Sequence, residues 1–596
     1  MPFFNVKMGC SQLMKNLIEF DGVDFSYSLP SGERIDAVRD LTFSIQPGEW
    51  VALIGANGSG KTTLVKLVNG LFVPDGGMVR VGGSLTSDRT HQAEIFSKIG
   101  LVFQNPRDQI VASLVEEDTA FGPENLCLPR AEINERVDAS LAMSGAAYLK
   151  KRPTYFLSAG ETQRIALAGV LALRPSCLIF DETTSMLDPR SRCDLLELMR
   201  KFHAQGFTIL HVTHDLDEAL LAERVLVLHA GRLVMDGSPQ QIFQKDEQLR
   251  EYGLTLPFLV RFARDLASLF PSIAPFYRSA GELLIDLRKI SAAGQTAAEP
   301  RREPSSVRSD ILIDVTRLAH AYMAGTPLER TALQDVTFSV AEGQSAGLVG
   351  QTGSGKSTLL QHLNGLIRPQ QGKVRMGDFD LSQKDVDVRA LRRQVGLVFQ
   401  IPEAQFFETY VGDEIAYAAR MLGYSGKLRE LVQTAMQMVG LDFERFVDRP
   451  LRSLSGGQKR RVALASYLVM QPRVLLLDEP FAGLDPLIHQ EMIELVRGFH
   501  EEGKTIVLST HTMRDLLQIA QKVIVLNEGK TAFEGSTMHL FHQPLLQTWG
   551  LEIPLELSIA EELRKKGRNI PVDKVQWRDM LQWLRANAAE GGHARL

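Results

Sequence analysis

Apolar residues gather along this chain in short runs that end in polar residues, and the runs alternate with stretches of helical periodicity such as Glu161–Leu173. Short apolar runs bounded by turn signals are typical of buried parallel strands. We expect such strands at Glu49–Ile54, Cys177–Asp181, Thr208–Val212, Gln344–Val349, Val474–Asp478 and Thr505–Ser509. Residues 21–45 and 313–340 alternate between polar and apolar, which predicts added antiparallel strands. The pattern therefore predicts an α/β fold with a mainly parallel central sheet.

The two halves of the chain repeat one another. GANGSGKT at Gly55–Thr62 returns as GQTGSGKS at Gly350–Ser357, and YGLTLPF at Tyr252–Phe258 matches WGLEIPL at Trp549–Leu555. Equivalent residues are 295 to 297 positions apart, as in the pairs Lys61 and Lys356, Asp181 and Asp478, and His214 and His511. So small a drift means few insertions, and the halves should share one fold from end to end.

This repeat divides the chain into five expected segments. A first domain at 15–240 is followed by a C-terminal extension at 241–290, and the second half repeats both parts at 310–537 and 538–596. Between the halves lies a segment at 291–309 that is rich in Ala, Pro, Ser and Arg. Such a composition predicts a flexible linker.

Composition limits the classes of function. The 596 residues are 44% apolar and carry a net charge of −5, which excludes wholesale disorder and gives no general basic field for nucleic acid. We find no apolar run near the ~20 residues that a membrane helix needs, and the first residues do not resemble a signal peptide. The four cysteines form no CxxC pair, so a zinc or disulfide framework is not expected. We expect a reducing compartment and no nucleic-acid partner.

The repeated glycine-rich segments have the form GxxxxGK[ST], each between an expected strand and an expected helix. Their backbone N–H groups would cradle phosphates, the lysine would reach the β- and γ-phosphates, and the Ser or Thr hydroxyl would bind Mg²⁺. Two matches at the repeat spacing predict nucleoside triphosphate binding. The expected binding residues are Gly55, Asn57, Gly58, Gly60, Lys61, Thr62 and Thr63 in the first half, and Gly350, Gly353, Gly355, Lys356, Ser357 and Thr358 in the second.

Paired carboxylates follow the next repeated strand in each half. Asp181 and Asp478 stand at strand ends, where a carboxylate can hold the shell of a Mg²⁺ ion. The adjoining Glu182 and Glu479 can polarise an attacking water, a role worth roughly 10²–10⁴ in rate. A histidine follows each glutamate at the same spacing, which makes a chance arrangement improbable.

LSAGETQR at Leu157–Arg164 and LSGGQKRR at Leu454–Arg461 stand shortly before these strands. With them, the chain resembles the ATP-binding cassette family over nearly all of both halves. The resemblance implies ATP and Mg²⁺ as cofactors and an intramolecular pairing of the halves, in which each signature loop closes over ATP on the opposite half. Site one would use Lys61, Asp181, Glu182 and His214 with Ser455 and Gly457. Site two would use Lys356, Asp478, Glu479 and His511 with Ser158 and Gly160.

The resemblance assigns further roles. Gln104 and Gln400 look like glutamines that sense Mg²⁺ and the attacking water, and His214 and His511 look like catalytic switch histidines. Residues 185–188 and 482–485 look like D-loops. Tyr27 and Tyr322 are placed like residues that stack on adenine, although a strand tyrosine is often only a packing residue.

The first signature departs from the family pattern, because it reads LSAGE with Ala159 and Glu161. Ser-x-x-Glu is a helix capping box, so the helix should form. The added carboxylate either slows site two by repelling phosphates or turns into the cap and changes little.

The segments Asn105–Leu126 and Ile401–Leu422, with the C-terminal repeats, resemble the ATPase subunits of energy-coupling factor (ECF) transporters for cobalt and vitamins. This implies uptake of a small micronutrient, with the protein at the cytoplasmic face of the membrane. Its partners would be a transmembrane coupling subunit and a small substrate-capture membrane protein. Basic coupling helices would meet Glu117, Asp118, Asp413 and Glu414, unless these are simply solvated carboxylates at helix starts.

Three alternatives stay open. A fused sugar-importer ATPase also carries two cassettes, but the intact second loop at Gly350–Ser357 does not favour it. A soluble tandem ATPase acting on ribosomes or DNA would need a charged arm, basic patches or zinc inserts. A regulatory scaffold without turnover is opposed by the two Glu–His pairs.

Overall fold

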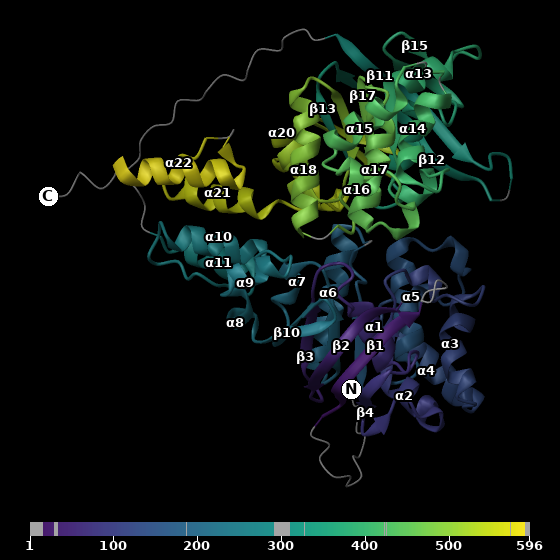
Figure 1. Ribbon diagram of the computed structural model, residues 1–596, viewed down its shortest axis with the longest axis vertical. Helices are drawn as coiled ribbons and strands as arrows, with labels where there is room; N and C mark the ends of the chain where they lie inside the picture. Colours follow the sequence, from purple (N-terminus) through teal and green to yellow (C-terminus); the bar gives the residue numbers. More distant parts are fainter. Residues whose placement is uncertain are drawn as a thin grey trace. The chain divides into compact units, whose positions relative to one another are not determined.

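The computed structural model describes residues 16–28, 34–185, 187–290, 310–326, 328–421, 423–424, 426–484, 486–571 and 574–590. The expected linker at 291–309 lies outside the described residues, as do Met186 and Asp485 of the expected D-loops. The chain forms two compact units (Figure 1). Unit 1 extends to Phe262, and unit 2 comprises the residues from Ala263 onward together with Asp188–Arg190.

Unit 1 is built on a six-stranded sheet with the order β10-β9-β3-β8-β7-β6. Its neighbouring strands are parallel, except that β10 is antiparallel to β9. The three central strands β3, β8 and β7 are buried throughout, as their apolar sequences predict. The strands are β3 (Trp50–Ile54), β6 (Ile99–Val102), β7 (Cys177–Asp181), β8 (Thr208–Val212), β9 (Arg224–His229) and β10 (Arg232–Gly237).

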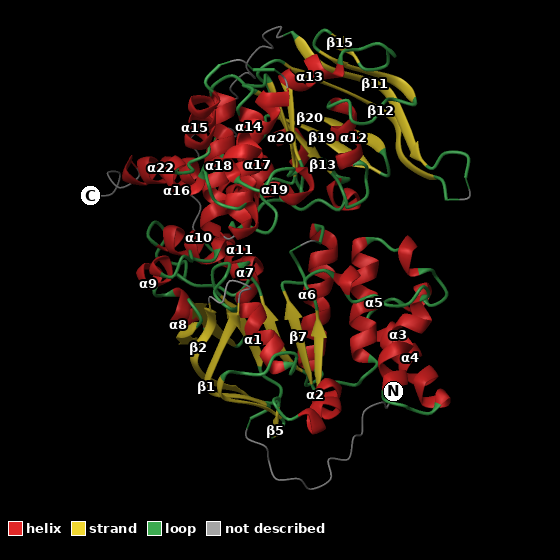
Figure 2. Ribbon diagram, turned by 45° about the vertical axis from the view of Figure 1, so that its right-hand side comes forward, coloured by secondary structure: helices red, strands yellow, loops and turns green. Residues whose placement is uncertain are grey.

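A second, antiparallel sheet of unit 1 has the order β2-β1-β4-β5 (Figure 2). Its strands are β1 (Ile18–Ser28), β2 (Arg34–Ile45), β4 (Gly76–Val81) and β5 (Ser84–Leu85). The helices of the first half are α1 (Lys61–Val68), α2 (Gln92–Lys98), α3 (Val115–Asn125), α4 (Arg130–Met143), α5 (Ala159–Leu171), α6 (Pro189–Ala204), α7 (Leu216–Ala219), α8 (Pro239–Phe243), α9 (Asp246–Glu251), α10 (Phe258–Ala267) and α11 (Ala280–Arg288).

Unit 2 repeats this architecture, with sheets of order β16-β17-β18-β13-β19-β20 and β12-β11-β14-β15. The strands are β11 (Ile311–Tyr322), β12 (Arg330–Ala341), β13 (Ser345–Val349), β14 (Gln371–Met376), β15 (Phe379–Asp380), β16 (Val395–Val398), β17 (Val474–Asp478), β18 (Thr505–Ser509), β19 (Lys522–Asn527) and β20 (Lys530–Ser536). The helices are α12 (Lys356–Leu363), α13 (Val388–Gln394), α14 (Val411–Met421), α15 (Leu428–Met438), α16 (Phe443–Phe446), α17 (Gly456–Leu468), α18 (Pro486–Glu501), α19 (Met513–Ile519), α20 (Thr537–Phe541), α21 (Leu555–Lys565) and α22 (Trp577–Glu590).

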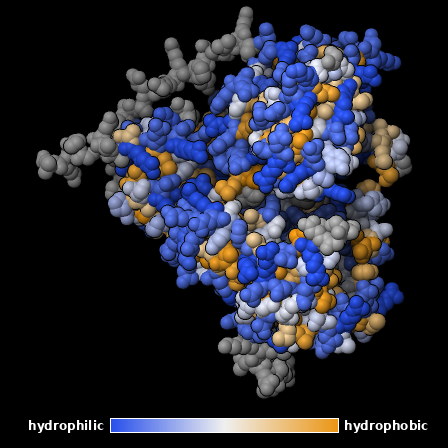
Figure 3. Space-filling view, viewed as in Figure 1, coloured by the Kyte–Doolittle hydropathy of each residue, from blue (hydrophilic) through white to orange (hydrophobic). Residues whose placement is uncertain are grey.

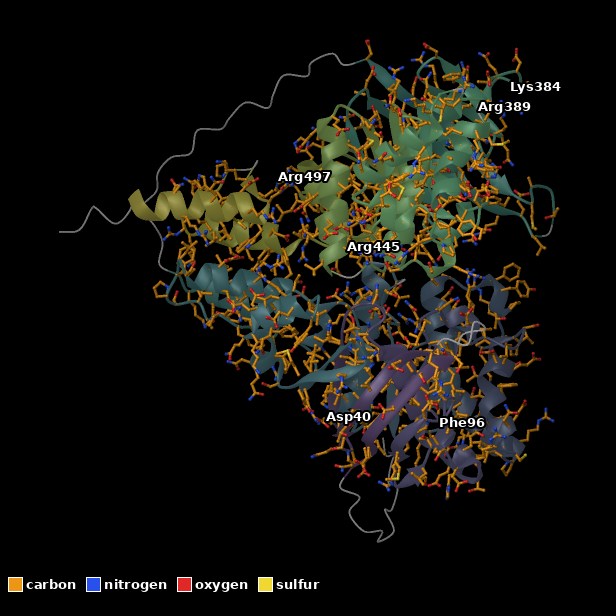
Figure 4. All side chains as sticks on the ribbon, in the orientation of Figure 1. Asp40, Phe96, Lys384, Arg389, Arg445 and Arg497 are labelled. Carbon is orange, nitrogen blue, oxygen red and sulfur yellow. The ribbon has the colours of Figure 1, made fainter. Side chains whose placement is uncertain are left out.

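The expected fold class is confirmed, and four of the six expected strands have the expected bounds. β3 and β13 each begin one residue later than expected, and α5 begins at Ala159, where Ser158 caps it. The repeat extends to backbone irregularities. Asp40, labelled in Figure 4, and its equivalent Asp335 both have left-handed backbones (φ 47° and 58°), and the β1–β2 and β11–β12 ladders shift register near them.

Helices from both expected C-terminal segments, 241–290 and 538–596, belong to unit 2. Within unit 2, α11 packs on α21, and Arg288 lies 3.4 Å from Glu562. Trp577 donates its indole N–H to Asp265 at 2.9 Å, and Arg568 lies over the Phe270 ring. The expected limits at 241–290 and 538–596 therefore describe the repeat in sequence, whereas packing groups the residues after Phe262 with unit 2.

No helix of the described residues is long and apolar enough to cross a bilayer. The face shown in Figure 3 is mostly hydrophilic on both units, with hydrophobic residues in scattered patches.

Unit 2 buries a pair of histidines where unit 1 has apolar residues. His320 of β11 and His362 of α12 take the places of Phe25 and Leu67 in the repeat. Their ring centroids are 4.9 Å apart, and His320 Nδ1 and His362 Nε2 are buried without a hydrogen-bond partner. Burial lowers the pKa of His362 to about 4 and also lowers that of His320. The folded unit therefore holds both rings neutral.

We expect this pair to make unit 2 less stable in acid. At His362 the unfolded chain binds a proton near pH 6.5 and the folded unit only near pH 4, so its contribution to stability is present above pH 6.5 and is lost as the pH falls toward 4. When the pH is lowered from 7 to 5, protonation of His362 in the unfolded chain alone should lower the free energy of unfolding of unit 2 by about 2 kcal/mol. Hydrogen exchange of α12, corrected for intrinsic rates, measures this loss, with α1 of unit 1 as internal control. His320→Phe with His362→Leu should abolish the difference, and equal loss of protection in α1 and α12 would contradict the assignment.

Candidate active sites

The glycine-rich loops follow β3 and β13 and lead into α1 and α12. At the last loop position, Gly60 and Gly355 have left-handed backbones (φ 105° and 103°). A Cβ at Gly60 would lie 2.4 Å from the Ala37 carbonyl oxygen, and one at Gly355 would lie 2.6 Å from that of Ala332. Only glycine fits there, because both the conformation and the space exclude a side chain. The N–H groups that open α1 and α12 point out of the helix and form an anion-binding helix end.

The loop lysines are buried and turn back onto their own loops. Lys61 Nζ donates to the carbonyl oxygens of Gly55 at 2.9 Å and Ala56 at 3.2 Å, and lies 3.6 Å from Glu182 Oε1. Lys356 Nζ donates in the same way to Gly350 at 2.7 Å and Gln351 at 3.0 Å. Burial lowers the pKa of Lys356, and the charges of Glu479 and Asp478 oppose that shift. Each loop thus holds its lysine Nζ against its own carbonyl oxygens.

The strand-end aspartates lie beside the hydroxyl groups that follow these lysines. Burial and the charge of Glu182 raise the pKa of Asp181 to about 6, while a hydrogen bond with Thr62 lowers it. Burial likewise raises the pKa of Asp478, against hydrogen bonds with Ser509 and Ser357. Carboxylate and hydroxyl oxygens are ligands that Mg²⁺ prefers. Asp181 Oδ1 is buried without a hydrogen-bond partner, so the first half offers an oxygen that fits a cation.

The glutamates after these aspartates converge with the predicted glutamines and histidines. Glu182 and Glu479 adopt left-handed backbones (φ 50° and 45°). Glu182 Oε2 accepts a hydrogen bond from Gln104 Nε2 at 3.1 Å and lies 3.6 Å from His214 Nδ1. Glu479 Oε2 accepts one from Gln400 Nε2 at 3.0 Å and lies 3.3 Å from His511 Nδ1.

This environment keeps both glutamates ionised. Burial raises the pKa of each glutamate, but the hydrogen bond and charge of its histidine, with nearby cations, outweigh that effect and bring the pKa below its ordinary value. An ionised carboxylate beside a phosphate loop can accept a proton from water. Each unit therefore brings its own lysine, aspartate, glutamate, glutamine and histidine together, as the motifs predict.

The two tyrosines expected to stack on adenine lie against the start of α1 and α12. Tyr27 Oη is 3.0 Å from Thr63 Oγ1, and Tyr322 Oη is 3.1 Å from Thr358 Oγ1. Their exposed fractions are 37% and 41%, so each keeps ring surface free beside the loop. Stacking on adenine stays a prediction.

The signature loops open α5 and α17 as capping boxes, which confirms the expected helix start. Ser158 and Ser455 each accept a hydrogen bond from the backbone N–H three residues on, and Glu161 and Gln458 return a bond to the cap. Glu161 also lies 3.2 Å from Arg152. Its carboxylate is therefore engaged in its own helix cap and by a cation, as one of the two expectations for Glu161 has it. Its effect on site two stays a prediction.

The signature glycines are packed closely within their own units. A Cβ at Gly160 would lie 2.7 Å from Ser191 Oγ, and one at Gly457 would lie 2.8 Å from the Ile488 side chain. The pairing of Ser158 and Gly160, or of Ser455 and Gly457, with the phosphate loop of the opposite half stays a prediction.

Two of the four carboxylates expected to meet a partner are buried, and the expectation is wrong for them. Asp118 Oδ1 accepts hydrogen bonds from the N–H groups of Val111 at 2.7 Å and Ala112 at 3.0 Å. Glu414 Oε2 does the same for Phe407 and Glu408, both at 2.9 Å. A partner cannot reach these side chains, because they hold the preceding loop from inside. Glu117 and Asp413 are exposed, and their contact with a partner stays a prediction.

The loops that follow β6 and β16 each contain a second glutamine, after Gln104 or Gln400, that the motifs did not predict. Gln109 Nε2 donates to the carbonyl oxygens of Leu101 and Ala166, both at 3.3 Å, and its Oε1 accepts from Phe103 N–H. Gln405 makes the matching bonds to Ala463 at 3.1 Å and from Phe399. These glutamines tie the loop after β6 or β16 to the signature helix. Their recurrence in NPRDQ and IPEAQ was the available signal.

Comparison with known proteins agrees with this geometry. The family model described as "ABC transporter" matches residues 38–185 and 333–482. An ABC transporter ATP-binding protein of Methanosarcina acetivorans is 33% identical over 588 residues, which are 95% of this chain and 93% of that protein. An HMP/thiamine import ATP-binding protein of Bacillus subtilis is 33% identical over 93% of this chain and 98% of its own length.

Among solved structures, cbiO1 from Clostridium perfringens, part of the ABC transporter complex cbiONQ, is 33% identical. It covers 40% of this chain and 94% of its own, with a TM-score of 0.36.

Proposed function

The chain belongs to the ABC transporter family as an ATPase with two ATP-binding domains in tandem, and from this we propose that it powers uptake of a small micronutrient through an ECF-type transporter. ATPases of this family act with membrane subunits. The finer proposal names a transmembrane coupling subunit and a small substrate-capture membrane protein as the partners, with this chain bound at the cytoplasmic face of the membrane.

The observation that carries the proposal is the link between the catalytic glutamates and an exposed apolar loop. Gln104 and Gln400 contact Glu182 and Glu479 and begin the loops described above. These loops then present large apolar side chains to solvent: Val111 is 61% exposed and Phe407 is 74% exposed. Exposed apolar side chains on a loop that buried carboxylates hold in place are typical of a surface that binds another protein. A partner seated there would act directly on the glutamine that contacts the catalytic carboxylate.

The hydrolytic chemistry follows from the site residues. Mg²⁺, when bound, would neutralise charge on the phosphates, and Asp181 with Thr62, or Asp478 with Ser357, would hold it. The loop N–H groups and the lysine would orient the β- and γ-phosphates. Glu182 or Glu479 would accept a proton from the attacking water, and the nearby histidine would stabilise the carboxylate in position.

Two features support a micronutrient as the cargo. The segments after Gln104 and Gln400 resemble ECF ATPases, and one relative over nearly the whole chain is described as an HMP/thiamine import protein. We therefore propose a vitamin, a vitamin precursor or a metal ion as the transported class.

The test is co-purification of the tagged protein from its native membranes in mild detergent, followed by mass spectrometry. We expect a multi-span coupling subunit and a small capture protein. Val111→Asp with Phe407→Asp should abolish this capture, because a charge would be buried in the contact, while ATPase activity of the isolated protein stays within about twofold. The matched control is Ile285→Asp, at another exposed apolar residue on α11, which should retain capture.

Other outcomes would correct the proposal. A permease that arrives with a substrate-binding lipoprotein would assign the chain to a sugar-type importer. Ribosomal or DNA-repair proteins without any membrane protein would overturn the transport role and leave the ATPase intact.

A further inference from the structure

One hydroxyl group in unit 2 connects the metal-binding aspartate to the catalytic glutamate. Ser509 is the last residue of β18 and is fully buried. Its Oγ donates to Asp478 Oδ1 at 2.6 Å and accepts a hydrogen bond from the Glu479 backbone N–H at 2.9 Å. The hydroxyl thus forms one hydrogen bond with each of two adjacent residues of the site. The side chain of Asp478 and the left-handed backbone of Glu479 are fixed together.

Unit 1 lacks this connection at the same point of its sheet. Asp181 pairs with Val212 in the β7–β8 ladder, as Asp478 pairs with Ser509 in the β17–β18 ladder. Val212 offers no side-chain hydroxyl, and Asp181 Oδ1 is buried without a hydrogen-bond partner. The Glu182 N–H bonds instead to the Val212 carbonyl oxygen at 2.9 Å. The glutamate backbone is held in both units, and each aspartate bonds to the hydroxyl of its own loop, Thr62 or Ser357. Only Asp478 has a second bond, through Oδ1 to Ser509.

We propose that Ser509 is a positioning residue that orients Asp478, and that the site of unit 2 consequently binds its divalent cation more tightly than the site of unit 1. This inference rests on the proposed role of Asp181 and Asp478 as metal-binding residues. A hydrogen bond that fixes the orientation of a ligating carboxylate typically changes metal affinity 10- to 100-fold when it is removed. Asp181, held by one hydroxyl, must lose more rotational freedom when the cation binds than Asp478, which is held by two.

The experiment measures binding of Mn²⁺, as the paramagnetic probe for Mg²⁺, by electron paramagnetic resonance. It uses the full chain with a non-hydrolysable ATP analogue, so the readout is independent of turnover. Lys61→Ala confines nucleotide to the site of unit 2, and Lys356→Ala confines it to that of unit 1. In the first background, Ser509→Val should raise the Mn²⁺ dissociation constant about 10-fold. Ser509→Thr, which has the shape of valine but keeps the hydroxyl, should stay within about twofold of the parent.

The opposite substitution, made in unit 1, tests the inference even if Ser509→Val prevents unit 2 from folding. In the second background, Val212→Ser should tighten Mn²⁺ binding several-fold, because it supplies the missing hydroxyl to Asp181. Equal affinities for the serine and valine forms in both units would overturn the inference, and a folding failure of Ser509→Val would leave Val212→Ser to decide it. Asp478→Asn separates the two proposals. If this variant keeps the affinity of its parent, the metal role of Asp478 itself is wrong.

Discussion

Replacing both Glu182 and Glu479 by glutamine is expected to lower ATP hydrolysis roughly 10²–10⁴-fold while ATP binding persists. Glutamine keeps the size of the side chain and can still bond to Gln104 or Gln400, but it cannot take a proton from water. Both glutamates are ionised, because their pKa values lie below the ordinary value, and each contacts the glutamine and the histidine of its own unit.

Single-turnover hydrolysis and nucleotide binding, measured on the same samples, separate chemistry from affinity. The single variants Glu182→Gln and Glu479→Gln show which site contributes more to ATP hydrolysis. The two sites can differ in rate, because their residues are not identical. Glu501→Gln, at an exposed position on α18, is the matched control and should hydrolyse ATP as the parent does. A double glutamine variant with parental turnover would remove both residues from the proton-accepting role.

Replacing Glu218 by alanine is expected to destabilise unit 1 by about 1–3 kcal/mol for each buried threonine hydroxyl that loses its acceptor, whereas Arg192 keeps Asp215 as an ion-pair partner. Glu218 is 2% exposed. Its Oε1 lies 2.8 Å from Arg192 Nε, and its Oε2 accepts hydrogen bonds from Thr184 at 3.0 Å and Thr213 at 2.9 Å. Burial raises the pKa of Glu218, but the charge of Arg192 and the bond to His211 hold it far below the ordinary value.

This cluster also supports the active site, since Thr184 follows Glu182 closely and Thr213 directly precedes His214. Hydrogen exchange of β8 should accelerate strongly in Glu218→Ala, whereas β18 of unit 2 serves as the internal reference. Glu218→Gln keeps the bonds from both threonines and should lose less stability. Unchanged protection of β8 in Glu218→Ala would contradict a structural role for the buried charge.

Much of the candidate site could be predicted because its parts are local in sequence. The glycine-rich loop, the strand-end Asp–Glu pair and the histidine each depend on a short motif, and parallel strands bring their carboxyl ends to one edge of a sheet. The spacing Ser-x-x-Glu was enough to predict the cap of α5. The twofold repeat strengthened each of these predictions, because an accidental motif would not recur at the same spacing.

The errors concern burial and long-range partners, which a motif does not encode. Asp118 and Glu117 are neighbours with the same chemistry, yet one is buried under its own loop and the other is exposed. Helical geometry turns adjacent residues about 100° apart, so the packed core decides which of them meets a partner.

The sequence by itself determined the tandem α/β fold and predicted the residues of two phosphate-binding sites, because strand periodicity and phosphate-loop motifs are local properties. Only the tertiary structure placed Ser509 and Val212 beside the aspartates of the two units, and only it showed that Glu218 is a buried ion-pair partner. Those contacts join strands and helices that are distant in the chain, and their energies depend on exclusion of water, which arises only when the core closes.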